Sequence, residues 1–375
     1  MRATRALIHT ANLRHNLSAI KKLTGEGVKL CLAVKADAYG HGAVGISETA
    51  VNAGTDYLAV ATISEAEELR ENGITIPIIV LSPVLPEELE TLYSLNLDSV
   101  VSTTGEIERL SSTSGTKKAA VHLKIDTGMG RIGCNPGEAL ELAAIITKTP
   151  GIELAGLCTH FPVSDSSAPD DIEYTKKQIN IFNTAVDSIR RAGINPGIIH
   201  AANSGAILNY PESYFDMVRP GILAYGYLPG GREGLFQELP AELLPKPVMS
   251  FESKLMHIKK VEAGSSISYG RRFRTEKATW IGTIPAGYAD GYTRSLTNRA
   301  GILINGKKYP VAGTVCMDQL MVDLGTELEV NLYDKVIMFG SEEGAETAAD
   351  LTAVTKTIPY ELLCSISKRV PRIFD

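Results

Sequence analysis

The sequence lacks the long apolar runs and the basic blocks that mark membrane proteins and nucleic-acid-binding proteins. No stretch of its 375 residues approaches the roughly 18 consecutive apolar residues of a membrane-spanning helix. Lysine and arginine together number 37, against 43 aspartates and glutamates, which gives a formal net charge of -6. This balance offers no positive surface to nucleic acid or to an anionic membrane. We therefore expect a small-molecule partner, no nucleic acid and no membrane.

Cysteine is scarce and shows no pairing pattern. The five cysteines are far apart and form no C-x-x-C motif, and no H-x-H pair occurs among the seven histidines. This distribution fits neither a disulfide framework nor a zinc site. The basic residues near the N-terminus are followed by no sustained apolar stretch of the kind a secretory signal needs. We expect reduced thiols, no metal and a cytoplasmic protein.

Residues 10 to about 220 alternate short β-branched runs with longer segments of helical period. Helical patterns cover residues 64–71, 86–95 and 171–191. The strand candidates are residues 30–34, 57–60, 78–81, 98–101, 120–125, 154–158, 198–200 and 216–218. Eight strand–helix units predict an α/β fold, a (β/α)₈ TIM-type barrel rather than an open sheet.

The texture of the sequence changes after Tyr227. Glycine and proline become frequent, and short alternating runs follow at residues 251–258, 279–284 and 336–338. Such runs are typical of a separate β domain. We predict a barrel domain over residues 1–240 and a mainly-β C-terminal domain over residues 241–375.

Polar and charged side chains stand where the predicted barrel strands end, which is the face that carries the chemistry in barrels of this kind. They are Lys35, Lys124, Arg131, His160, His200 and Arg219. Small-residue turns follow the seventh and eighth strands, at residues 201–205 and 219–222. Such turns can direct backbone N–H groups and a serine hydroxyl toward an anion, although they also simply cap helices. They suggest a ligand that carries a phosphate.

Lys35 leaves an apolar strand end, residues 32–34. Partial desolvation lowers the pKa of such an amine and makes it a candidate Schiff-base nucleophile. Taken alone, a lysine at such a position more often simply extends to solvent at the barrel rim. Opposite a phosphate site, however, it has the layout of an enzyme that uses pyridoxal 5′-phosphate (PLP).

Nine motifs occur in order across both predicted domains. They are residues 33–42, 124–131, 159–161, 203–205, 219–222, 268–270, 287–291, 315–318 and 358–361. In these motifs the sequence closely resembles bacterial alanine racemases, which are fold-type III PLP enzymes, over nearly its whole length. The resemblance implies an isomerase that interconverts L-alanine and D-alanine and supplies D-alanine for cell-wall peptidoglycan.

The resemblance also implies how PLP is held. Lys35 would carry the cofactor, and Arg219 would face its pyridine nitrogen. A guanidinium cannot accept a proton, so that nitrogen should stay unprotonated and the ring should be a weaker electron sink. The remaining implied cofactor contacts are Tyr39, His160, Asn203, Ser204, Gly221, Ile222 and Tyr360.

Racemisation needs one base on each face of the substrate. By resemblance, Lys35 serves one face and Tyr269 of a neighbouring subunit serves the other, in a homodimer with shared active sites. His160 would link Tyr269 to Arg219. Nearby cationic groups favour the phenolate form of this tyrosine.

At the substrate end, the resemblance implies roles for five further residues. Arg131 would orient the carboxylate, with Lys124 carbamylated as in many members of the family. Met317 and Asp318 would complete the carboxylate site, and Tyr288 would lie at the substrate entrance.

Other interpretations compete with alanine racemisation. A racemase for another small amino acid such as serine shares all of these features. A fold-type III decarboxylase would lack the Ser-Tyr-Gly and Cys-Met-Asp patterns, and a PLP carrier without turnover would not need a second base. A metal-dependent hydrolase on the same barrel would need several His and Asp ligands at the strand ends.

The sequence departs from the family pattern in two places, which are Leu7-Ile8-His9 near the start and the basic segment at residues 270–273.

Overall fold

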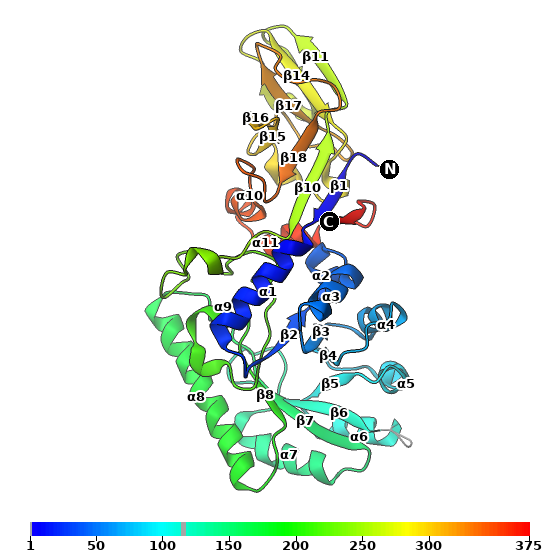
Figure 1. Cartoon of the computed structure of the whole chain (residues 1–375), viewed down its shortest axis with the longest axis vertical. Helices are drawn as coiled ribbons and strands as arrows, with labels where there is room; N and C mark the ends of the chain where they lie inside the picture. Colours follow the sequence, from blue (N-terminus) through cyan, green and yellow to red (C-terminus); the bar gives the residue numbers. More distant parts are fainter. Residues whose placement is uncertain (1, 114–117) are drawn as a thin grey trace. The chain divides into compact units, whose positions relative to one another are not determined.

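The computed structural model describes residues 2–113 and 118–375 (Figure 1). The chain divides into two compact units. One consists of Arg14–Ala38 and Ala43–Pro245, and the other of Met1–Leu13, Tyr39–Gly42 and Lys246–Asp375. The predicted domain boundary near residue 240 divides the chain by sequence position alone, and it stays a prediction. By spatial contacts, the first residues of the chain and residues 39–42 group with the C-terminal part.

The first unit is built on a closed barrel of eight parallel strands, which confirms the predicted fold class. The strands are β2 (Lys29–Ala33), β3 (Tyr57–Val60), β4 (Ile78–Val80), β5 (Asp98–Val101), β6 (Ala119–Lys124), β7 (Ile152–Cys158), β8 (Ile198–His200) and β9 (Met217–Val218). Each begins and ends within two residues of its predicted range. Buried apolar side chains line these strands, because a parallel sheet covered by helices exposes neither face.

Helices lie outside the barrel strands (Figure 1). They are α1 (Thr10–Thr24), α3 (Ala43–Asn52), α4 (Ile63–Glu71), α5 (Leu89–Ser94), α6 (Thr104–Thr113), α7 (Ala139–Lys148), α8 (Pro169–Arg191) and α9 (Ser204–Asn209). Local sequence explains their ends. A capping box of Thr62 and Glu65 opens α4. Proline at the first position of α8, acids in its first turn and arginines in its last suit the helix dipole.

Lys35 opens a turn of unusual hand, α2 (Lys35–Gly40). Residues 36–39 have φ between 51° and 54°, and Gly40 has φ of 80°. A left-handed turn brings Cβ close to the next carbonyl oxygen and costs about 1–2 kcal/mol per non-glycine residue. Side chains support the turn, because Glu65 accepts the N–H of Ala36 at 2.7 Å and Asp37 accepts that of Ala43 at 2.8 Å. Backbone strain therefore follows directly after Lys35.

The second unit is mainly β. Its large sheet has the order β16-β15-β18-β10-β1-β19, and smaller sheets join β11-β14-β17 and β12-β13. The strands are β1 (Arg5–Ile8), β10 (Met249–Lys254), β11 (His257–Val261), β12 (Ser266–Ile267), β13 (Phe273–Arg274), β14 (Thr279–Ile284), β15 (Gly301–Ile304), β16 (Lys307–Pro310), β17 (Leu320–Gly325), β18 (Lys335–Phe339) and β19 (Arg372–Phe374). Two short helices, α10 (Ala348–Thr355) and α11 (Pro359–Cys364), accompany them.

One predicted strand of this unit is wrong. The run at residues 251–258 is broken at Leu255 and Met256, whose N–H groups bond to the carbonyls of Asp334 and Thr283 instead of continuing one ladder.

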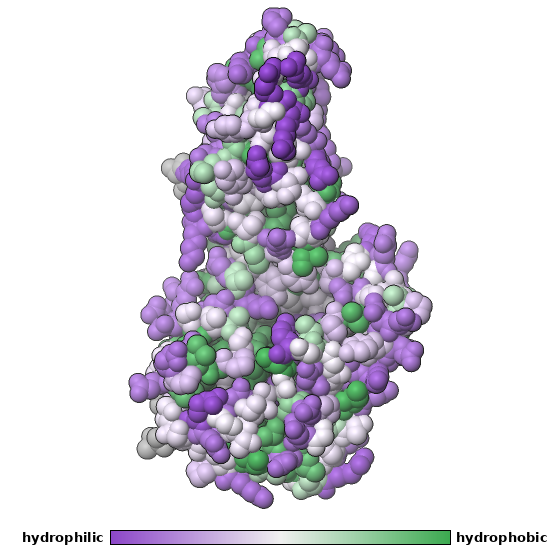
Figure 2. All heavy atoms as spheres, turned by 180° about the vertical axis from the view of Figure 1, so that it is seen from behind, coloured by the Kyte–Doolittle hydropathy of each residue, from purple (hydrophilic) through white to green (hydrophobic). Residues whose placement is uncertain are grey.

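On the face shown in Figure 2, hydrophobic residues form small separate patches among hydrophilic ones. The apolar residues that decide the fold are inside.

Candidate active site

The C-terminal strand ends of the barrel unit gather positive charge. Lys124 and Arg219 are buried there, with 8% and 6% of their surfaces exposed. Burial, followed by the charges of Lys124, Arg219, Arg131 and Lys35, lowers the pKa of His160 well below its ordinary value. His160 is therefore a neutral imidazole, and the cluster as a whole suits an anionic ligand.

Arg219 follows β9 and is held by acceptors on three sides. Its Nη1 donates to Nδ1 of His200 at 2.7 Å, and its Nη2 donates to the carbonyls of Thr159 and Ala201 at 2.7 and 2.9 Å. Nδ1 of His160 lies 3.4 Å from the same Nη2. Burial lowers the pKa of Arg219, and burial together with the charge of Arg219 lowers that of His200. The guanidinium is thus fixed in orientation beside two neutral histidines.

The turns after β8 and β9 meet at Ser204. Its Oγ accepts the N–H groups of Gly221 at 2.9 Å and Leu223 at 3.3 Å. With its lone pairs used, the hydroxyl acts toward a ligand as a donor, which suits a phosphate oxygen. Ile222 beside Gly221 is buried.

Asn203, predicted to contact the cofactor, forms hydrogen bonds that hold this turn together. Its Oδ1 accepts the Ser164 hydroxyl at 2.7 Å and the N–H of Ala206 at 3.1 Å. Its Nδ2 donates to the carbonyl of Phe161 at 3.0 Å. These bonds place the neighbouring Ser204, so a direct contact of Asn203 with the cofactor stays a prediction.

Lys124 and Arg131 stand on either side of a glycine-rich loop. Burial lowers the pKa of Lys124 to about 8, and the charges of Arg219 and Arg131 act in the same direction. The carboxylate of Asp126 accepts N–H groups of Gly128 and Gly130 and fixes the loop that carries Arg131. A lysine with so low a pKa has a substantial neutral fraction, the form that can react with carbon dioxide. Carbamylation itself stays a prediction.

Tyr269 lies in the second unit and is 71% exposed. It sits on a tight turn, η5 (Tyr269–Arg271), where Ser268 and Gly270 have φ of 65° and 71°. Thr314 donates its hydroxyl to the carbonyl of Tyr269 at 2.7 Å, and Ser268 donates to the carbonyl of Thr314 at 2.6 Å. The backbone is held while the phenol is presented outward.

Tyr288, Met317 and Asp318 lie on two loops that are bonded to each other. The N–H of Tyr288 donates to the carbonyl of Cys316, and that of Ala289 to the carbonyl of Met317, both at 3.0 Å. All three predicted residues are exposed, and Tyr288 lines a hollow of about 360 Å³. The structure therefore brings these three together within their unit.

Arg369 and Asp290 hold these loops, and the sequence analysis missed them. Arg369 donates to both carboxylate oxygens of Asp290, at 2.7 and 3.0 Å, and to Asp318 at 2.8 Å. Burial alone would raise the pKa of Asp290. Hydrogen bonds from Arg369 and Arg2 outweigh this effect and keep that pKa below its usual value. Asp290 lies within a recognised motif, but its partner is 79 residues away, so no local signal could reveal the pair.

Tyr39 and Tyr360 pack against each other in the second unit. Their ring centroids are 5.8 Å apart and their planes are tilted by 46°. Burial raises the pKa of Tyr39, so its phenol stays protonated and can donate a hydrogen bond. A Cβ on the nearby Gly40 would meet the carbonyl oxygen of Leu363 at 2.2 Å, so only glycine permits this approach.

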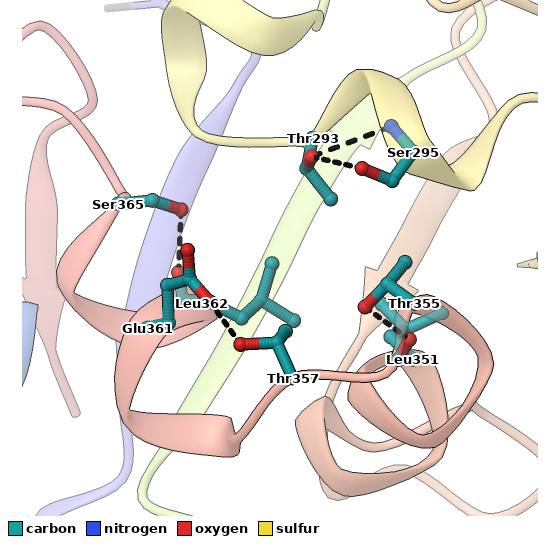
Figure 3. A pocket seen from close by; sticks show the side chains of 8 residues that line it. All are labelled: Thr293, Ser295, Leu351, Thr355, Thr357, Glu361, Leu362 and Ser365. Carbon is teal, nitrogen blue, oxygen red and sulfur yellow. Dashed lines mark hydrogen bonds between the residues drawn. The ribbon is translucent and has the colours of Figure 1, made fainter.

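A second hollow of about 210 Å³ lies beside α11 (Figure 3). Its polar side chains bond mainly to one another and to the local backbone. Glu361 accepts the Thr357 hydroxyl, and Ser365 donates to the carbonyl of Leu362 (Figure 3). These residues already satisfy each other, and they do not present a converging set of ligand groups.

Metal-binding and membrane-spanning features can be judged for residues 2–113 and 118–375. No group of three or more His, Cys, Asp or Glu side chains there could hold a metal ion. Over the same residues, no helix is long and apolar enough to cross a membrane.

A closed parallel barrel with a lysine after its first strand and a serine-centred turn after its seventh defines a class, the barrel-type PLP-dependent enzymes. Family models agree. That for the N-terminal domain of alanine racemase matches residues 8–229, and that for the C-terminal domain matches residues 248–374. The chain belongs to the alanine racemase family, and the expected PLP dependence is that of the family.

Individual relatives give the same result along the whole chain. Alanine racemase of Treponema denticola is 50% identical over 100% of this chain and 98% of its own, and that of Treponema pallidum is 45% identical over 100% of both. Among solved structures, alanine racemase of Clostridium difficile 630 has a TM-score of 0.93 at 40% identity, covering 100% of this chain and 96% of that one. The same enzyme has been solved in complex with cycloserine.

Proposed function

We propose that this protein interconverts L-alanine and D-alanine, using PLP held at the strand ends of the barrel. The observation that carries the proposal is the arrangement of Lys35, Ser204 and Arg219 on a chain that matches alanine racemases from end to end. The product would be D-alanine for cell-wall peptidoglycan, made in the cytoplasm.

The barrel residues fit the cofactor. The Ser204 hydroxyl is oriented as a donor for the phosphate, and Lys35 contributes to the positive charge felt by His160. When bound, PLP supplies an electron-accepting ring that acidifies the substrate Cα–H. Arg219 donates to three protein acceptors and has no acceptor atom of its own, so it would leave the pyridine nitrogen unprotonated.

Two bases would move the proton, one on each face of the substrate. Lys35 would serve one face, and Tyr269 of a second copy of the chain would serve the other. The exposure of Tyr269 on a fixed turn supports this, because a phenol in that position is accessible to another chain. We therefore propose a homodimer with shared active sites, in which the neutral His160 links the phenol to Arg219.

Arg131 would bind the substrate carboxylate. A carbamate on Lys124 would replace a buried cation with an anion beside that arginine, which would hold Arg131 in place. Met317 and Asp318 would complete the carboxylate site, and Tyr288 would line the entrance. A slower reaction with serine is compatible with all of these groups.

Chiral chromatography tests the proposal directly. The purified protein is incubated with L-alanine or L-serine, with Lys35→Ala as the control variant. We expect rapid formation of D-alanine, slower formation of D-serine and neither product from the variant. Absence of both products from a protein that shows the yellow absorption of bound PLP would favour a PLP carrier or another substrate.

A further inference from the structure

The structure assigns to Asp98 and His122 a positioning role toward Arg219. They hold His200 in the one tautomer that accepts a hydrogen bond from the guanidinium. This inference rests on the proposed function, because Arg219 matters through the cofactor that it would face. Neither Asp98 nor His122 belongs to the motifs that identify the site.

Four side chains form a hydrogen-bonded line through the interior of the barrel. Nδ1 of His200 accepts from Nη1 of Arg219 at 2.7 Å. Nε2 of His200 lies 2.9 Å from Nδ1 of His122, and Nε2 of His122 lies 3.4 Å from Oδ2 of Asp98. Asp98 is the first residue of β5, and Arg219 follows the end of β9. The line therefore runs from the strand starts to the strand ends.

The direction of every hydrogen bond follows from Arg219. A guanidinium only donates, so Nδ1 of His200 carries no proton, and the neutral ring must carry its proton on Nε2. That proton faces Nδ1 of His122, which must accept. His122 then carries its proton on Nε2 and donates it to Asp98, whose carboxylate only accepts.

The same logic excludes a charged histidine within the line. A second proton on His122 would sit on Nδ1 and face the N–H of His200. A second proton on His200 would face the guanidinium of Arg219. Burial and the charge of Arg219 also lower the pKa of His200. Both rings are therefore neutral, each in one tautomer.

The backbone is shaped around this pair of histidines. The two rings meet edge to face, with centroids 4.9 Å apart and planes at 81°. A Cβ on Gly156 of β7 would come within 2.3 Å of Nδ1 of His122, so glycine is required beside the ring. The pairing of β6 with β7 also shifts register between Val121 and His122, and such bulges re-aim side chains.

Loss of the line should free His200 to adopt its other tautomer. A proton on Nδ1 would then face Arg219, and the 2.7 Å bond would be lost. Two carbonyls would remain as partners, and they leave the guanidinium free to shift relative to a ligand. Asp98 and His122 thus act on the reaction only through the placement of Arg219.

A matched pair of variants at residue 122 tests this inference. In His122→Asn an amide oxygen can still accept from Nε2 of His200, whereas the nearly isosteric His122→Leu offers no acceptor. Asp98→Asn weakens the outer end. Asp56→Asn is the control, because Asp56 also precedes a barrel strand but accepts the N–H of Leu30.

The main measurement is the tautomer of His200 by two-bond ¹H–¹⁵N correlation in PLP-loaded protein labelled with [¹⁵N]histidine. We expect the proton on Nε2 alone in the wild type, in His122→Asn and in Asp56→Asn. In His122→Leu a mixture should appear, the absorption band of the bound cofactor should shift, and kcat should fall on the order of tenfold with KM little changed, the size seen when an outer partner orients a functional group. Asp98→Asn should change each reading in the same direction but less.

A proton on Nδ1 of wild-type His200, or a doubly protonated His200, would overturn the inference. So would a His122→Leu protein with the same tautomer and absorption as wild type. If His122→Leu does not fold, Asp98→Asn decides, and identical spectra in Asp98→Asn and Asp56→Asn would count against the inference. The tautomer and the absorption need no turnover, so a chain that failed to racemise alanine would still give a clear answer.

Discussion

The surroundings of Arg219 in the barrel interior and the turn that carries Tyr269 differ in how many of their functional groups have partners within the same unit. Around Arg219, every donor described above meets an acceptor within the same unit, and even the tautomers of two histidines are determined. Tyr269 has a firmly held backbone but a phenol that is 71% exposed. The difference indicates that the barrel unit fixes Arg219 by itself, whereas the exposed phenol of Tyr269 would act as a base only in the proposed dimer, beside another chain.

Mixing two inactive variants tests most directly whether Tyr269 completes the site of another chain, and it should give the largest effect. Lys35→Ala and Tyr269→Phe should each abolish racemisation, since each removes one of the two proposed bases. In a mixed dimer, one site would combine an intact Lys35 with an intact Tyr269 from the other chain. Random exchange should therefore restore about a quarter of the wild-type activity, as the statistics of a symmetric dimer require.

The assay is D-alanine formation after the two variants are unfolded together and refolded. Each variant refolded alone serves as the control. No recovery from the mixture, with normal recovery of refolded wild type, would show that the two bases do not come from different chains.

The sequence foretold the barrel well because its strands are short apolar runs between clear helical patterns. It could not reveal β1 and β19, which pair with each other although Ala6 and Arg372 lie at opposite ends of the chain. The left-handed turn after Lys35 was also missed, because residues 36–39 include no glycine to announce it. A turn of that hand is imposed by tertiary contacts, not by local preference.

Site residues divide in the same way. Those within recognisable motifs could be named in advance, whereas the partners that hold them could not. His122 stands between apolar residues of a strand and has the appearance of a core residue. Its partners Asp98 and His200 are 24 and 78 residues away. Only the closed barrel brings them into one line.

Burial of Lys124 in the barrel unit is unfavourable whenever its amine is charged. Its pKa is lowered from 10.5 to about 8 in the folded protein, so the unfolded chain binds the proton more tightly. Stability due to this residue should rise with pH between about 8 and 10.5, and below pH 8 the full penalty of a buried charge remains. Relative to Lys124→Met, the free energy of unfolding should gain up to about 3 kcal/mol across that window.

Urea unfolding of both proteins at several pH values, in buffers freed of carbon dioxide, measures this difference. Lys118→Met, at an exposed lysine just before β6, is the control for the loss of one lysine side chain. A constant difference between wild type and Lys124→Met would mean that Lys124 keeps an ordinary pKa in the folded state.

Ser204→Ala tests the phosphate end more gently. The change removes a donor for the phosphate and leaves the N–H groups of Gly221 and Leu223 without their acceptor. A charge-assisted hydrogen bond contributes about 1.5–3 kcal/mol, so PLP should bind about 10- to 100-fold more weakly. Spectrophotometric titration of the apoprotein with PLP gives the Kd. Ser213→Ala, which removes a buried hydroxyl bonded to the carbonyl of Tyr210, should leave that Kd unchanged.

The smallest expected effect concerns the strained turn after Lys35. Ala36 is exposed and has φ of 53°, so glycine at this position should relieve strain and stabilise the protein by about 1 kcal/mol. Ala349 is also exposed but lies in the right-handed helix α10, where the same Ala→Gly change should destabilise by about 1 kcal/mol. The two variants differ only in the hand of the backbone. Opposite shifts of Tm would confirm that the left-handed turn is held against its local preference, and destabilisation by both would show that Ala36 carries no strain.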